Sequence, residues 1–159
     1  MERPLNLGCP NFCKGFLCVD KFPKDKNVLK ADVYEYLQEC ADRGVRRKSI
    51  FKKNLLEHLG NPLDFLVLCC RSLEQSGTLT VITDNAEFLP YYIPLANVGT
   101  GLGGHSTSNY ALGMNHSVHF TLYTKLHLGN LLREAGFENK VRRIPQVFFA
   151  RLEAKAVSP

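Results

Sequence analysis

The sequence predicts an α/β fold in which helices cover both faces of a largely parallel sheet. Short apolar runs typical of buried strands alternate with amphipathic helical segments along most of the chain. The length of 159 residues suits one domain that buries its own core, so we expect residues 1–159 to form a single domain. Hydrophobic residues make up 45% of the chain and charged residues 22%, which excludes a disordered or low-complexity protein.

The N-terminal part of the chain predicts three strands. Apolar runs indicate buried strands at residues 5–7 and 16–20, and a shorter strand at 27–30. Only residues 9–15 separate the first two strands, whereas a parallel crossover normally needs a dozen or more residues and a helix. Either that helix is absent and the link is extended, or the strands lie elsewhere.

Two helices carry clear start signals. Asp32 is a helix N-cap with Glu35 three positions later, and apolar residues follow at helical spacing until Gly44. Asn61 caps a second helix, and Pro62 stands at its first position. The second helix is apolar almost all round, so we expect it to be well buried.

The same reasoning places the remaining elements. Residues 49–51 and 78–83 are typical of strands, the second of them strongly β-branched. Leucines at helical spacing predict a last helix over 124–136, and two closing strands follow at 137–141 and 146–152. Between strand and helix, periodicity fails over 88–117, and a loop of this length in a compact domain is usually functional. We expect it to form a lid or an acceptor-binding region.

Positive charge is concentrated in one stretch. The formal net charge is +5. The bases within residues 43–53, where no acid occurs, are Arg43, Arg46, Arg47, Lys48, Lys52 and Lys53. Such a stretch could attract nucleic acid or an acidic partner, but it is more often a solvated helix end and the strand after it. The first residues do not resemble a signal peptide, and no apolar run could span a bilayer, so we expect a cytoplasmic protein.

The six cysteines predict reduced thiols rather than disulfides or a metal site. The chain is too long to need a disulfide framework. Cys9, Cys13 and Cys18 are separated by three and four residues, which differs from the C-x2-C spacing of structural zinc sites. We interpret these three as small buried apolar residues and predict no metal.

Ligands of open α/β sheets bind beyond the carboxyl ends of the strands, so the residues at those ends are the candidate site. The first strand ends at Gly8 and Cys9, where the missing side chain of glycine lets the backbone approach a ligand. The second ends at Asp20, whose carboxylate can accept hydrogen bonds from the two hydroxyls of a ribose. Asp32 follows the third strand and Asn54 the fourth.

Several short phrases at these positions resemble the class I S-adenosylmethionine-dependent methyltransferases, especially their short forms. Residues 5–9 read Leu-Asn-Leu-Gly-Cys, and residues 15–20 read Gly-Phe-Leu-Cys-Val-Asp. Three further matches follow the family's order along the chain: the pair at 31–32, the phrase Leu-Glu-His-Leu at 56–59 and the stretch at 131–137. The resemblance implies a Rossmann-like, mostly parallel sheet of six to seven strands whose last strand is antiparallel.

The resemblance also implies roles for individual residues in binding S-adenosylmethionine. Gly8 and Cys9 would line the methionine portion, and Asp20 would hold the ribose hydroxyls. The adenine would be faced by Asp32 with Val33, and the sulfonium end by Asn54. The chain departs from the family at one position, where Pro10 replaces the second glycine of the loop, removing an N–H and fixing φ.

These residues predict a methyltransferase whose acceptor is not identified. The motif Asn/Asp-Pro-Pro-aromatic of amino-group methyltransferases is missing after the fourth strand, which favours a small molecule or a sugar hydroxyl. A hydroxyl acceptor would benefit from a base. The candidates for this base are His58, His105, His116, His119 and Tyr123.

Two other functions remain open from the sequence. In the first, the loop altered at Pro10 no longer holds the cofactor, and the chain is a non-catalytic binding module whose basic stretch binds RNA or an acidic partner. In the second, the chain is a different doubly wound nucleotide-binding domain, because a carboxylate at the end of the second strand also suits other adenosine ligands. Asp32 would cap its helix under either hypothesis.

Overall fold

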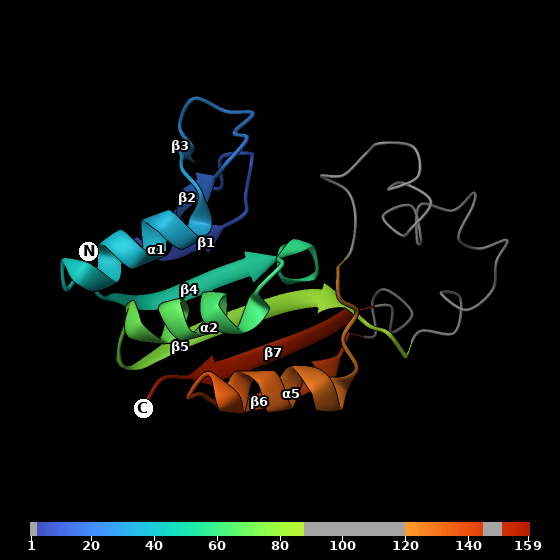
Figure 1. The fold of residues 1–159 in the computed structure, drawn as a ribbon. Helices are drawn as coiled ribbons and strands as arrows, with labels where there is room; N and C mark the ends of the chain where they lie inside the picture. Colours follow the sequence, from blue (N-terminus) through green and yellow to red (C-terminus); the bar gives the residue numbers. More distant parts are fainter. Residues whose placement is uncertain (1–2, 88–119, 145–150) are drawn as a thin grey trace, which may run out of the picture.

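A seven-stranded sheet forms the centre of the molecule (Figure 1). The computed structural model describes residues 3–87, 120–144 and 151–159. The strand order is β3-β2-β1-β4-β5-β7-β6. The strands are β1 (Leu5–Leu7), β2 (Leu17–Asp20), β3 (Leu29–Lys30), β4 (Arg47–Lys53), β5 (Leu73–Asp84), β6 (Glu138–Arg143) and β7 (Arg151–Val157). The pairs among β1 to β5 are parallel, and β7 runs antiparallel to both β5 and β6, which confirms the predicted Rossmann-like sheet.

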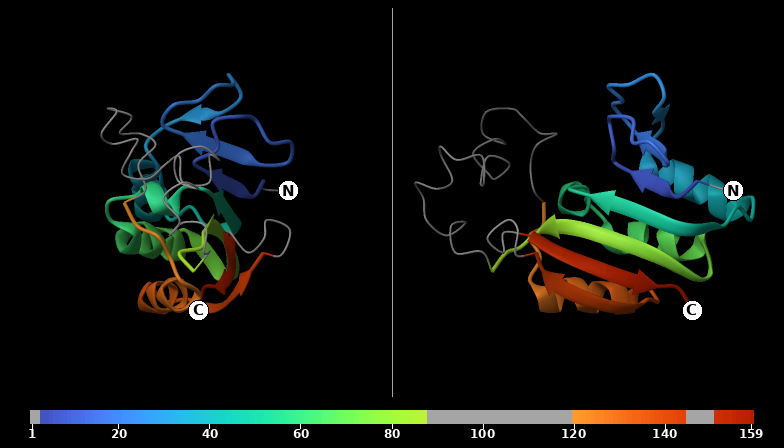
Figure 2. Two further views of the ribbon diagram at one scale, coloured as in Figure 1. Left: turned by 90° about the vertical axis from the view of Figure 1, so that its right-hand side faces the viewer. Right: turned by 180° about the vertical axis from the view of Figure 1, so that it is seen from behind.

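The described α-helices lie together on one face of this sheet (Figures 1 and 2). They are α1 (Val33–Asp42), α2 (Pro62–Arg71) and α5 (Lys125–Glu134), and a 3-10 turn, η1 (Leu56–His58), precedes α2. The sequence predicts helices on both faces, whereas the described residues place none on the second. The chain crosses from β3 to β4 and on to β5 in one direction, and right-handed crossovers in one direction put their helices on the same face. None of these helices is long and apolar enough to cross a membrane.

From β1 to β2 and on to β3, the chain crosses the sheet in the direction opposite to that from β3 to β5. The links between these first strands contain no helix. Residues 8–16 join β1 to β2, and these strands pair directly, with Leu5 opposite Leu17 and Leu7 opposite Val19. The crossover helix is therefore absent and the link is short, as one of the two predicted alternatives has it. The ring of Phe16 at the end of the link lies 6.0 Å from that of Phe51, on the helix-free face.

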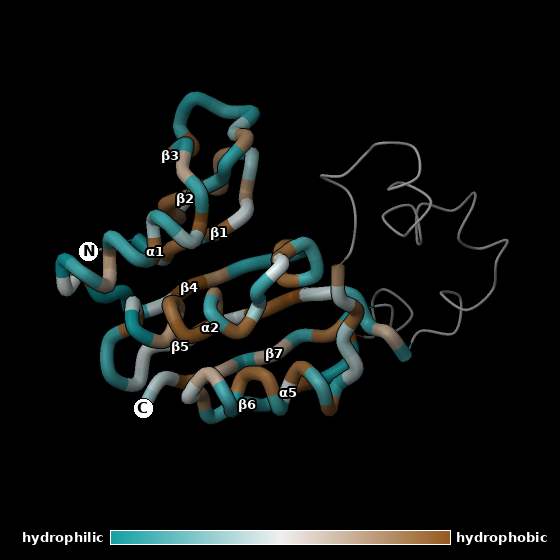
Figure 3. The backbone as a smooth tube through the Cα atoms, in the orientation of Figure 1, coloured by the Kyte–Doolittle hydropathy of each residue, from teal (hydrophilic) through white to brown (hydrophobic). Residues whose placement is uncertain are grey.

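Alternation along the strands puts the core between the sheet and the helices. On β7, Leu152, Ala154 and Ala156 are fully buried, and the residues between them are more exposed. Ile50 of β4 and Leu79 of β5 continue the row that Ala156 starts. The hydropathy colouring shows apolar residues on the central strands and the helices that cover them, and polar ones on the link between β2 and β3 (Figure 3).

One row of the core contains a buried charge. Lys52 lies between Leu7 and Val81 in the register, and its side chain is fully buried. Its Nζ is 3.9 Å from Oε2 of Glu57, which is also buried and accepts a hydrogen bond of 2.8 Å from the hydroxyl of Thr83. The prediction that Lys52 belongs to a partner-binding basic stretch is wrong, because the two-residue period of β4 turns it inward with Ile50.

The N-cap of α1 leads to a first prediction. The Oδ1 of Asp32 accepts a 2.9 Å hydrogen bond from the Tyr34 N–H, as the sequence predicts. Asp32→Ala should lower the free energy of unfolding by about 1 kcal/mol in urea denaturation, and Asp32→Asn by less, because its amide oxygen still accepts this bond.

The same cap predicts a pH dependence. Burial raises the pKa of Asp32, but the Tyr34 N–H and the Lys21 ammonium outweigh it and hold the pKa below its ordinary value of 3.8. The difference in free energy of unfolding between wild type and Asp32→Ala should be largest above pH 3.8, the ordinary pKa of Asp32. It should shrink as the pH falls through the lower pKa that Asp32 has in the folded protein. A difference that is constant down to acid unfolding would contradict this role of the carboxylate.

The buried pair leads to a second prediction. Glu57→Gln leaves the Lys52 ammonium without its counter-charge and should lower the free energy of unfolding by about 3 kcal/mol at pH 7. The double variant Lys52→Met/Glu57→Gln should recover most of this loss, because no charge is left in the core.

Burial also lowers the pKa of Lys52 to about 8, although Glu57 opposes this. The ordinary pKa of a lysine is 10.5, so between about pH 8 and pH 10.5 Lys52 binds more protons in the unfolded chain than in the folded one. The free energy of unfolding should therefore rise with pH over this range. Chemical denaturation over this range should show the rise in wild type but not in Lys52→Met. An identical pH profile for both proteins would show that Lys52 is not buried.

Candidate functional site

The predicted site residues follow one another along the carboxyl edge of the sheet. The strand order β3-β2-β1-β4 places Asp32, Asp20, Gly8 and Asn54 in that sequence. Backbone hydrogen bonds fix the neighbours, because the Ala31 N–H donates to the Asp20 carbonyl at 3.1 Å and the Gly8 N–H to that of Val19 at 2.9 Å. Four adjacent strands span about 14 Å at this edge, which suits an elongated ligand.

Asp20 is partly exposed at the end of β2, and its carboxylate is partly engaged. Its Oδ1 accepts a 2.7 Å hydrogen bond from the Phe22 N–H, which closes a tight turn after the strand. No hydrogen bond from a described residue reaches its Oδ2. The turn therefore fixes the carboxyl group and leaves one oxygen able to accept hydrogen bonds from a ligand.

The ends of β1 and β4 have unusual backbone conformations that lie side by side. Gly8 has φ of +68°, and a Cβ placed on it would lie 2.9 Å from Cδ1 of Leu55, so only glycine fits. Asn54 has φ of +51°, a left-handed conformation that asparagine tolerates better than most residues. The chain itself thus explains the glycine, and Leu55 fills the space beside it.

Asp32 and Val33 are already used by the fold. Besides capping α1, Asp32 forms an ion pair with Lys21, whose Nζ is 3.2 Å from its Oδ2. Val33 is buried in the hydrophobic core. These contacts fix both residues at the end of β3. They do not test whether Asp32 and Val33 face an adenine, which stays a prediction.

A cleft of about 410 Å³ opens between the ends of β1 and β4. Its lining comprises Asn6, Gly8, Cys9, Pro10, Cys13, Phe51, Lys53 and Asn54. Asn6 pairs with Phe51 in the register, between core residues, so the cleft lies on the helix-free face. It unites three predicted positions, Gly8, Cys9 and Asn54, whereas Asp20 and Asp32 lie at the next strand ends and do not line it.

The predicted bases differ in accessibility. His58 is partly buried on η1. Tyr123 is 3% exposed and donates a 3.4 Å hydrogen bond to the Leu56 carbonyl, and burial raises its pKa far above its ordinary value, which makes it a poor base. His105, His116 and His119 lie outside the described residues, as does the predicted loop at 88–117.

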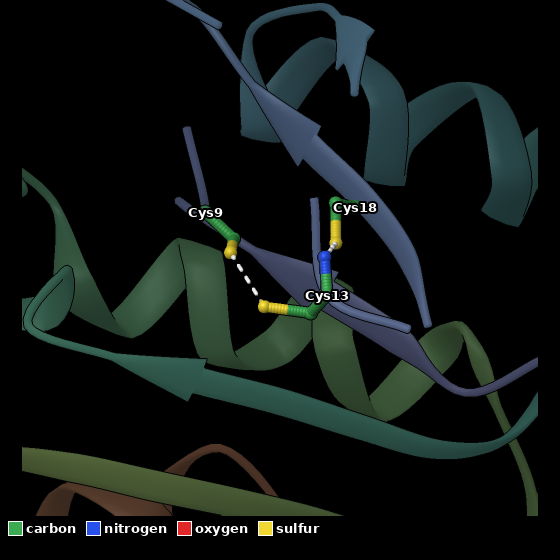
Figure 4. A group of neighbouring side chains, drawn as sticks. All are labelled: Cys9, Cys13 and Cys18. Carbon is green, nitrogen blue, oxygen red and sulfur yellow. Dashed lines mark hydrogen bonds between the residues drawn. The ribbon is translucent and has the colours of Figure 1, made fainter. Parts of the chain in front are cut away.

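Three thiols gather beside the cleft (Figure 4). The Sγ atoms of Cys9, Cys13 and Cys18 all lie within 4.8 Å of one another, and those of Cys9 and Cys13 are 3.4 Å apart. Burial, with the hydrogen bond between the two thiols, raises the pKa of Cys9 to about 12. The interpretation as buried apolar residues holds for Cys18 alone, because Cys9 and Cys13 are only partly buried. The spacing of the cysteines in the sequence did not predict this cluster, because the pairing of β1 with β2 brings Cys18 to Cys9 and Cys13.

The other bases of the basic stretch remain at the surface to different degrees. Arg46, Lys48 and Lys53 are exposed, and Arg47 is partly buried. Arg43 forms an exposed ion pair of 2.8 Å with Glu39, one turn earlier on α1.

Comparisons with known proteins bear on the fold. No protein-family model matches the sequence, and no curated protein matches it. Among solved structures, an S-adenosylmethionine-dependent methyltransferase from Archaeoglobus fulgidus is similar, with a TM-score of 0.64 and 18% identity over 98% of this chain and 86% of its own. An S-adenosylmethionine-dependent methyltransferase from Thermotoga maritima has a TM-score of 0.59 and 15% identity, over 99% and 82% of the two chains.

A third similar structure is phosphoethanolamine N-methyltransferase 2 of Haemonchus contortus in complex with S-adenosyl-L-methionine. It has a TM-score of 0.61 and 12% identity, and the match covers 99% of this chain but 49% of the larger enzyme. At such identities the likeness concerns the fold, and it agrees with the strand order and the antiparallel β7 described above. The chain therefore has the fold of S-adenosylmethionine-dependent methyltransferases.

Proposed function

We propose that this protein binds S-adenosylmethionine along the β3–β2–β1–β4 edge and transfers its methyl group to a hydroxyl of a small molecule or sugar. The proposal is carried by the continuous line of Asp32, Asp20, Gly8 and Asn54 across this edge, next to the cleft at Asn54. The similarity to structures of methyltransferases, one of them crystallised with S-adenosyl-L-methionine, supports it.

The residues present fit such a cofactor at Asp20 and at the cleft. The free Oδ2 of Asp20 can accept hydrogen bonds from the ribose hydroxyls, which are donors that a carboxylate binds well. The cleft beside Gly8 and Asn54 can take the methionine portion. Pro10 offers no N–H there, so its neighbours Gly8 and Cys9 must supply the backbone contacts of the loop.

When bound, S-adenosylmethionine supplies a methyl group on a sulfonium, which is an electrophile. The chain's part in the reaction is then mainly to hold the acceptor in line with that methyl group and to exclude water. Among the predicted bases within the described residues, His58 keeps partial accessibility. We assign to it the removal of the proton from the acceptor hydroxyl. His105 and His119 remain alternative bases.

The proposal predicts that cofactor affinity depends on Asp20. Isothermal titration with S-adenosylhomocysteine should give saturable one-site binding to the wild type. Asp20→Asn should weaken it by about tenfold to a hundredfold, because one charged acceptor is lost while the amide oxygen can still accept the Phe22 N–H. Asp25→Asn is a matched control, because Asp25 accepts the same kind of turn bond, 2.8 Å from the Asn27 N–H, but lies within the link between β2 and β3 and not at a strand end.

The outcomes separate the functions that the sequence leaves open. Equal loss of affinity in both variants would show an effect on the turns rather than on the ribose. No binding of S-adenosylmethionine or S-adenosylhomocysteine at millimolar concentration would overturn the proposal. A salt-sensitive RNA affinity that disappears in Arg46→Gln/Lys48→Gln would then favour the binding module.

A further inference from the structure

We propose that Cys9, Cys13 and Cys18 bind one thiophilic metal ion, with Zn²⁺ as the expected occupant. This goes beyond the proposed methyl transfer and does not depend on it, because the three sulfur atoms come from the short link between β1 and β2 and from β2 itself.

The sulfur atoms are close to the geometry that such an ion requires. In a tetrahedral site with Zn–S bonds of about 2.3 Å, the sulfur atoms are about 3.8 Å apart. Here Cys9 and Cys13 are 3.4 Å apart at Sγ, and all three sulfur atoms fit within 4.8 Å (Figure 4). Side-chain adjustments of less than 1 Å would therefore bring all three thiolates to one ion.

The backbone holds the three cysteines in place independently of any ion. Cys18 pairs with Asn6 in the register of β2 and β1, so its side chain lies on the helix-free face. The Phe16 N–H donates to the Cys13 carbonyl at 3.1 Å, and the Lys24 N–H donates to the carbonyl of Pro10, next to Cys9, at 2.7 Å. The cluster is thus preorganised.

A backbone N–H and a lysine lie near the sulfur atoms. The Cys13 N–H points at Sγ of Cys18, 3.4 Å away, and such outer hydrogen bonds orient metal ligands. Three thiolates and one Zn²⁺ carry a net charge of −1, and the exposed Lys53 lines the same cleft as Cys9 and Cys13. A positive charge is therefore available beside the site.

An ion at this site would hold the β1–β2 link against the sheet, as a crossover helix does by packing in other parallel sheets. The β1–β2 link has no helix to pack against the sheet, and part of it is exposed, including Asn11 and Phe12. Tying Cys9 and Cys13 to Cys18 would fasten the link to β2 and so convert binding free energy into stability of this edge. With three protein ligands, the fourth position is left for water or a solute from the cleft that Cys9 and Cys13 line.

Titration with Co²⁺ as the probe tests this site. The 159-residue protein is reduced, stripped of metal with a chelator and titrated without oxygen and without S-adenosylmethionine. We expect one equivalent of Co²⁺ to give a thiolate charge-transfer band and the visible bands of a tetrahedral site, and Zn²⁺ to abolish both.

Matched variants assign the ligands. Cys9→Ser and Cys13→Ser should each weaken the charge-transfer band and lower Co²⁺ affinity at least tenfold, and Zn²⁺ should raise the melting temperature of the wild type more than theirs. Cys70→Ser is the control, because Cys70 is also partly buried but lies on α2, outside the cluster. It should bind like the wild type.

Several results would overturn the site. They are the absence of a thiolate band in the reduced wild type, a band that survives unchanged in both Cys9→Ser and Cys13→Ser, and equal loss in Cys70→Ser. A Cys9–Cys13 disulfide in the purified protein, with no Co²⁺ binding after reduction, would show that the pair is a redox couple instead. Failure of S-adenosylhomocysteine to bind leaves these readouts unchanged, so the two proposals fail separately.

Discussion

The handedness of crossovers between parallel strands governs the layout of this molecule. From β3 to β6 the chain moves across the sheet in one direction, and the right-handed rule places α1, α2 and α5 on one face. From β1 to β3 it moves the other way, and here the links are too short for a helix. One face thus has a helical cover and a continuous core. On the other face the described part of the chain places the link at residues 8–16 beside Phe51.

The change of direction also sets where a ligand can bind. It occurs between β1 and β4, and such a switch point leaves a crevice beyond the strand ends because the connections leave it on opposite sides. The cleft lies here, lined from both strands by Asn6, Gly8, Phe51 and Asn54. No helix stands between β1 and β2, and two cysteines of the link, Cys9 and Cys13, line the cleft there. The departure from the common fold and the thiol cluster therefore have one cause.

Local rules predict the elements whose signals are local. Asp32 and Asn61 cap two of the three predicted helices, and Pro62 opens the second, because these contacts lie within one turn of the chain. The strand ends at Gly8 and Asp20 were equally predictable. Lys52 was not, because six bases within residues 43–53 suggest a solvated surface, and only the register with Leu7 and Val81 shows that it is buried. The cysteine cluster was missed for a similar reason, since pairing of β1 with β2, rather than spacing, brings Cys18 to Cys9 and Cys13.

The buried pair connects the core to the cleft. Removing two charges from water costs more than a pair usually returns, so a gain in stability is a weak explanation for Lys52 and Glu57. Their position gives a better one. Glu57 lies in η1, and its backbone carbonyl accepts the N–H of Phe120, while its carboxylate is fixed by Thr83 of β5. The turn held in this way carries Leu55 against Gly8 and places Asn54 at the strand end. A charge that must be matched inside the core therefore fixes a turn next to the cleft, and the geometry of the candidate site depends on a contact outside its lining.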